Sequence, residues 1–89
     1  MNDSYLEVTF RHGRVVAAYL YLPRAAGQKS ARSRRVEPGL VIDFAASGRP
    51  IGIEITAPAR LSLVAINGVL EELSLTSLAP ADLSPLVAA

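Results

Sequence analysis

Apolar and polar residues alternate along the first part of the chain, which is the pattern of half-buried β-strands. Two such runs, at residues 5–10 and 15–22, flank a short polar turn with a central glycine, Arg11-His12-Gly13-Arg14. We therefore predict a β-hairpin that ends at Pro23, because proline cannot donate a hydrogen bond to a sheet. The residues predicted to face the core are Leu6, Val8, Phe10, Val16, Ala18, Leu20 and Leu22.

Turn residues predict a second hairpin in the middle of the chain. Residues 33–37 and 40–44 flank Pro38-Gly39, and these two residue types suit the central positions of a tight turn. A two-residue loop would place Arg34 opposite Asp43 and Val36 opposite Val41. A bulge would instead shift this pairing by one residue and exchange the two faces.

The next turn signal is Ala45-Ala46-Ser47-Gly48, which predicts a type I turn with Gly48 in the left-handed conformation. This turn would close a hairpin onto a strand at residues 51–56, with Pro58 beyond its end. The three isoleucines at positions 51, 53 and 55 would share the core face of that strand.

After residue 60 the apolar period changes from two residues to three or four, which indicates a helix. Ser62 is the predicted N-cap, and a strand over residues 61–66 is the alternative interpretation. A second short helix is predicted to start at Pro80, with Asp82 near its positive end. The predicted buried residues are Leu63, Ile66, Val69, Leu70 and Leu73 in the first helix, and Leu83, Leu86 and Val87 in the second.

Together these elements predict an α+β fold with about five short antiparallel strands in sequential meander order and one or two C-terminal helices. The 89 residues are expected to form a single domain, with the meander at about 5–57 and the helical part at about 62–88. Hydrophobic residues make up 51% of this small chain and charged residues only 19%. A chain this short and apolar buries its surface poorly by itself, so we expect self-association or a protein partner.

Charge is distributed unevenly along the chain although the formal net charge is only +1. Residues 11–35 hold seven basic side chains and no acidic one, and residues 24–32 show no apolar period. We predict a basic loop at the tip of a hairpin between the second and third strands. Its candidate contacts to nucleic acid or to an acidic protein are Arg24, Lys29, Arg32, Arg34 and Arg35. No aromatic residue lies within residues 23–43, so stacking on single-stranded bases is not supported.

Three strand carboxylates, Glu7, Asp43 and Glu54, are predicted to lie opposite the apolar face, together with Tyr19 and Tyr21. If their strands are neighbours, these oxygens could run acid–base chemistry or hold a hard cation. The alternative is a solvated face on which the acids pair with Arg34 or Arg35.

Several function classes lack a signature in this sequence. The glycines match neither the dinucleotide fingerprint nor the P-loop, so no cofactor is expected. His12 is the only histidine and there is no cysteine, so we predict no metal site of these ligands and interpret His12 as a turn residue. No apolar run is long enough to cross a membrane and nothing resembles a secretory signal, so the expected location is the cytoplasm.

The middle of the chain resembles a small prokaryotic family known as domain of unknown function 2283. The matching residues are Tyr19-Leu20, Val36-x-Pro38-Gly39, Val41-Ile42-Asp43-Phe44, Gly48 and Gly52-Ile53-Glu54-Ile55, within about residues 17–57. The resemblance implies a bacterial or archaeal origin and a short β-meander, and it implies no reaction. The sequence departs from the family where acidic residues are usual, at Arg11, His12 and Arg14 and at Ala45-Ala46-Ser47, so cation binding there is not implied.

The absence of a catalytic constellation, the small size and the segregated charge favour a non-enzymatic protein-interaction module, antitoxin-like or self-associating. Nucleic-acid binding through residues 24–35 and a carboxylate-based cation site remain as alternatives.

Overall fold

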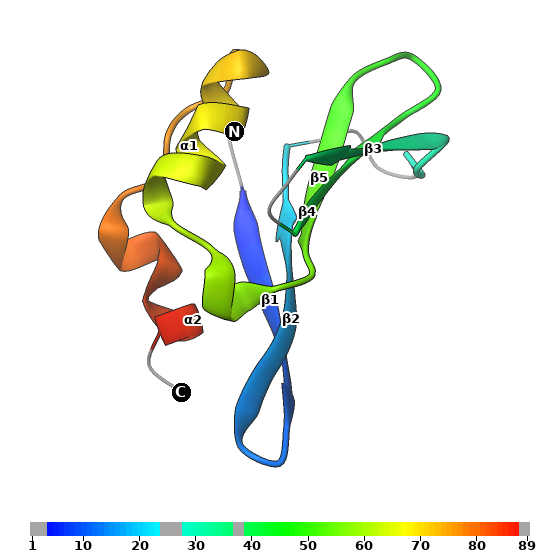
Figure 1. Ribbon diagram of the computed structural model, residues 1–89. Coiled ribbons are helices and arrows are strands. Elements are labelled where there is room, and N and C mark those ends of the chain that lie inside the picture. The colour runs from blue at the N-terminus through cyan, green and yellow to red at the C-terminus, as the bar shows by residue number, and fades with distance from the viewer. Residues whose placement is uncertain (1–3, 24–27, 37–38, 88–89) are drawn as a thin grey trace.

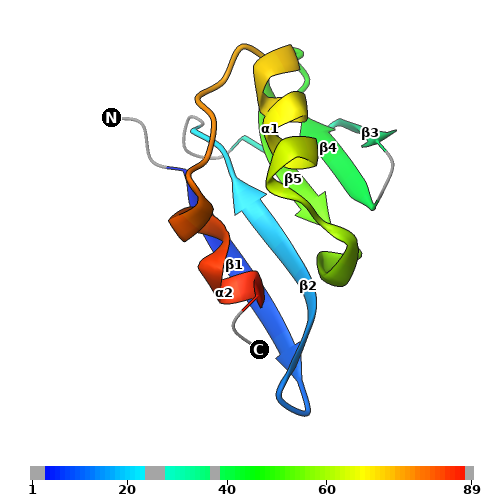
Figure 2. The ribbon, with the colours of Figure 1, turned by 60° about the vertical axis from the view of Figure 1, so that its left-hand side comes forward.

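The computed structural model describes residues 4–23, 28–36 and 39–87, and it shows an antiparallel sheet with helices on one face (Figures 1 and 2). The strands are β1 (Tyr5–Arg11), β2 (Arg14–Tyr21), β3 (Arg32–Val36), β4 (Leu40–Phe44) and β5 (Pro50–Ile55). The helical elements are η1 (Pro58–Arg60), α1 (Leu63–Glu72), η2 (Pro80–Leu83) and α2 (Ser84–Val87). This arrangement confirms the predicted α+β class.

The strand order is β1-β2-β5-β4-β3, which departs from the predicted sequential order. The chain connects inner strand β2 to edge strand β3, and two hairpins then bring β5 back beside β2, as in a Greek key. The reason lies in the side chains. Pairing β2 with β5 sets Leu20 beside Ile53 in the middle of the core. The arginine side chains of β3 keep their contact with water because β3 lies at an edge of the sheet.

The first hairpin turns through two residues, His12 and Gly13, which both have positive φ angles of 53° and 77°. Its register shifts after Thr9, because Thr9 pairs with Ala17 whereas Phe10 pairs with Val15. Val16 is thus the extra residue of a β-bulge in β2, and its predicted core position is wrong: it is 43% exposed and Val15 packs on the core instead.

The second hairpin has a register one residue away from the predicted two-residue loop. Ser33 pairs with Asp43 and Val36 with Leu40, so residues 37–39 separate the strands and Gly39 takes a φ of +73°. Arg34 consequently lies opposite Ile42 on the helix side of the sheet. Pro38, the other turn residue of the prediction, lies outside the described residues.

The core lies between the sheet and the helices and is wholly apolar among the described residues. The isoleucines at 51, 53 and 55 are each 0% exposed, and Gly48 is left-handed, as predicted. Ser62 caps α1 by accepting a hydrogen bond from the Ala65 amide at 3.1 Å, and the helix excludes the alternative strand at residues 61–66.

The C-terminal segment is fixed to α1 by side-chain and backbone hydrogen bonds. Asn67 donates to the Leu78 carbonyl and accepts from its amide, at 3.0 and 2.7 Å. The second helix starts at Pro80 as a 3₁₀ turn, and Leu83 and Leu86 are buried as predicted, whereas the side chain of Val87 lies outside the described ones. No helix within residues 4–23, 28–36 and 39–87 is long and apolar enough to cross a membrane.

Candidate functional site: the open face of the sheet

The sheet face opposite the helices is built from two rows of side chains that cross all five strands. One row, in strand order, is Tyr5, Tyr21, Gly52, Asp43 and Ser33. The neighbouring row is Glu7, Tyr19, Glu54, Val41 and Arg35. The three carboxylates and two of the tyrosines that sequence alternation placed opposite the core therefore share this open face.

The three tyrosines of the chain form a continuous tyrosine cluster on β1 and β2, with Tyr5 and Tyr21 in one row and Tyr19 in the other. The rings of Tyr5 and Tyr21 stack, with centroids 4.5 Å apart and planes 12° from parallel. Tyr19 meets Tyr21 edge to face at 4.7 Å. Tyr5 is 59% exposed, and the other two rings are half-buried. Such offset and edge contacts hold aromatic rings in fixed orientations.

Tyr19 reaches across β5 to a carboxylate on β4. Its hydroxyl donates a hydrogen bond of 2.7 Å to Oδ2 of Asp43, and the Ser33 hydroxyl donates one of 2.6 Å to Oδ1. The phenol passes directly over Gly52, where a Cβ atom would overlap it. Sequence reasoning missed this role, although a glycine inside a strand is a known signal of close approach by another group.

Glu7 and Glu54 lie on either side of Tyr19 in their row. Oε1 of Glu7 accepts a hydrogen bond of 3.1 Å from the Tyr21 hydroxyl. Glu54 is exposed and makes no hydrogen bond or ion pair with any described residue. The backbones of these two residues are two strand spacings apart, about 10 Å. Within the described parts of the chain no group of three histidine, cysteine or acidic side chains could hold a metal.

The basic candidates do not gather on one surface. Arg32 lies over the ring of Phe44, 5.5 Å from its centroid, and Arg34 forms an ion pair of 3.3 Å with Glu72 on the helix side. Arg35 lies on the open face and Lys29 is exposed ahead of β3. Arg24 lies outside the described residues. Because β2 and β3 are not neighbours, the basic segment is not the predicted hairpin loop.

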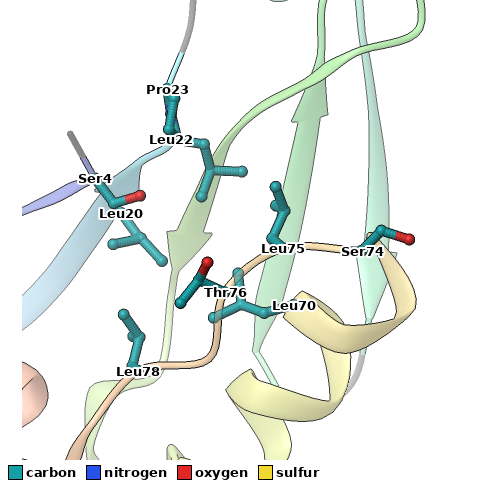
Figure 3. Close-up of a pocket in the computed structure, with 9 residues that line it drawn as sticks. All are labelled: Ser4, Leu20, Leu22, Pro23, Leu70, Ser74, Leu75, Thr76 and Leu78. Carbon is teal, nitrogen blue, oxygen red and sulfur yellow. The ribbon is translucent and has the colours of Figure 1, made fainter. Parts of the chain in front are cut away.

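A cavity of about 340 Å³ opens on the helix side, between β2, the end of α1 and the segment that follows it (Figure 3). Its lining combines leucines with a proline and three hydroxyl residues: Leu20, Leu22, Leu70, Leu75 and Leu78 with Pro23, Ser4, Ser74 and Thr76. Among the residues that the structure describes, no acidic, basic or histidine side chain lines this cavity.

The fold and the open face define a small α+β protein in which helices cover only one face of the sheet. Residues 17–57 match the family described as protein of unknown function (DUF2283), which confirms the resemblance inferred from the sequence. The matched segment runs from β2 through β5 and contains Tyr19, Asp43 and Gly52. No curated protein matches this chain, and no solved structure matches it.

Proposed function

We propose that this protein is a small non-enzymatic interaction module that binds a protein partner on the open face of its sheet. The observation that carries the proposal is the tyrosine cluster of Tyr5, Tyr21 and Tyr19 on the face that the helices leave uncovered. Tyrosine is enriched at protein interfaces because a rigid ring covers much area and loses little conformational entropy on binding. Rings already fixed by their neighbours lose even less.

The charges of the face favour a partner that presents arginine or lysine. Glu54 is exposed beside Tyr19 and has no partner among the described residues. A guanidinium group can pair with such a carboxylate while its flat side lies on a neighbouring aromatic ring. We therefore propose that a basic side chain of the partner docks between Glu54 and the tyrosine cluster.

The test is affinity purification of the tagged protein from its own cells, with and without nuclease, followed by quantitative mass spectrometry. The open-face variant is Tyr5→Ser combined with Glu54→Lys, since both side chains are exposed. The matched control is Val64→Ser on α1, because Val64 is 83% exposed and lies outside this face. Circular dichroism establishes that both variants are folded.

The proposal predicts one near-stoichiometric protein that survives nuclease, is lost at least tenfold from the open-face variant and is retained by the control. Retention of that protein by the open-face variant contradicts the proposal. Loss of all companions on nuclease treatment would instead favour nucleic-acid binding through the basic residues around β3.

A further inference from the structure

The two edges of the sheet differ in how they discourage pairing with another strand. The β3 edge has five residues, three of them arginines, and like charges on an edge repel a second copy. The β1 edge has seven residues and only two charges, Glu7 and Arg11, which are of opposite sign. The bulge residue lies in β2, so β1 keeps its regular alternation. A long, regular edge without like-charge protection is a template for strand addition.

We infer that β1 pairs antiparallel with β1 of a second copy of this chain, about a two-fold axis at Thr9. This inference goes beyond the proposed function, since it concerns the edge of the sheet at β1 and not the open face. The pairing sets Glu7 opposite Arg11 of the second copy, and the symmetry repeats that ion pair. Val8 then lies opposite Phe10 of the second copy, and the two Thr9 side chains meet on the axis. Opposite charges, threonine pairs and aromatic–β-branched pairs are each favourable across strands.

Charge selects this register among those that keep the apolar residues on one side. An axis at Glu7 would place two carboxylates opposite each other, which is unfavourable. An axis at Val8 would set both charges opposite neutral residues, Glu7 against Thr9 and Arg11 against Tyr5. Any register shifted by one residue would set core-facing residues opposite open-face residues.

Most of the exposed large apolar side chains lie on the hairpin that contains this edge. Of the four large hydrophobic residues exposed in the described parts of the chain, Tyr5, Phe10 and Val16 lie on β1 or β2. Phe10 is 55% exposed because the β1–β2 hairpin extends beyond the helical layer (Figure 1). A second copy at β1 covers Phe10 and joins the two open faces into one surface of ten strands.

The first test uses the fact that the chain has no cysteine. Thr9→Cys introduces a single thiol that meets its symmetry mate on the axis, so mild oxidation is expected to give a covalent dimer in high yield. Arg35→Cys is the matched control, since Arg35 is exposed on the same face at the opposite edge. Equal crosslinking of the two variants overturns the inferred register.

The second test is molar mass by light scattering over a range of concentrations. Glu7→Arg and Arg11→Glu are each expected to weaken the dimer at least tenfold, and the double variant is expected to restore it. Glu7 and Arg11 of one chain are about 13 Å apart along the strand, so this rescue cannot come from a contact within one chain. Single variants that dimerise like the parent, or a parent mass that stays at 9.4 kDa, overturn the inference.

The dimer and the outside partner can be tested independently of each other. The variant with Tyr5→Ser and Glu54→Lys keeps Glu7, Thr9 and Arg11, so it is expected to stay dimeric while losing the captured protein. Capture of a protein on the open face by a monomeric chain removes the inference alone. A dimer that captures no protein removes the proposed outside partner and leaves the β1 pairing intact.

Discussion

Gly52→Ala is the change that most sharply probes how the open face is held together. Residue 52 lies in β5 with a φ angle that alanine adopts freely, so the backbone is not strained by the substitution. The added methyl group instead occupies the space of the Tyr19 phenol. Tyr19 must therefore swing away from β5, and its hydrogen bond to Asp43 breaks.

The energetic cost follows from the contacts that Tyr19 loses. A hydrogen bond to a charged acceptor contributes about 1.5–3 kcal/mol, and an edge-to-face aromatic contact contributes about 0.5–1.5 kcal/mol. Replacing glycine in a strand returns about 0.5–1 kcal/mol, because the unfolded chain has less freedom to lose. The expected net loss is about 1–4 kcal/mol, and each kcal/mol lowers the Tm of a domain of this size by about 4–8 °C.

The assay is thermal and urea unfolding of four proteins: the parent, Gly52→Ala, Tyr19→Ala and the double variant. Without the phenol the methyl group meets no obstacle, so in the Tyr19→Ala background Gly52→Ala is expected to be neutral or stabilising by about 0.5–1 kcal/mol. An equal loss of stability in both backgrounds would refute the steric explanation.

Three further predictions concern the core, a helix end and the carboxylates. Ile53→Asp buries an unpaired charge at a fully buried position, so no cooperative unfolding transition should remain. Thermal unfolding like that of the parent would show that residue 53 does not face the core. Ser74 follows the C-cap residue of α1 with a φ of +61°, so Ser74→Gly should raise stability by about 1 kcal/mol in urea titrations, and an unchanged midpoint would contradict this. Calcium, magnesium or manganese should leave the Tm unchanged, because no three acidic side chains of the described residues lie close enough together to hold a metal; a rise in Tm that is lost in Glu54→Gln would support the cation hypothesis.

Local features of the fold could be predicted because they depend on nearby residues. Alternation at residues 51–56 identified the buried isoleucines, and Ser62 was recognised as a cap from its place before an apolar period. Gly48 was assigned correctly because few residues other than glycine adopt positive φ at a hairpin turn. The family resemblance over residues 17–57 also rested on such local patterns.

Features that depend on strand pairing could not be read from the sequence. The place of β3 at the edge follows from competition between β3 and β5 for β2, which local alternation does not report. The bulge at Val16 and the three-residue connection before Leu40 each changed a register by one residue, and apolar alternation fits either choice. The basic residues therefore point to both sides of the sheet, although they are close in sequence.

The partners of the carboxylates were missed for a similar reason. Asp43 lies beside Gly52 and Ser33 only because β4 pairs with both β5 and β3, and Tyr19 reaches it from a strand that is not adjacent to β4. A glycine in the middle of an isoleucine-rich strand was the one available signal. It shows that another group approaches closely and does not identify that group.

Contact between the open face and a protein partner can be detected by site-specific photocrosslinking in the native cells. A photoreactive phenylalanine analogue replaces Tyr5 in one strain and Val64 in another, since both side chains are exposed but lie on different sides of the molecule. A partner on the open face should give a discrete crosslinked protein from position 5 and none from position 64. Crosslinking from position 64 alone would rule out the open face as the binding surface, because it would place the partner on the helix side.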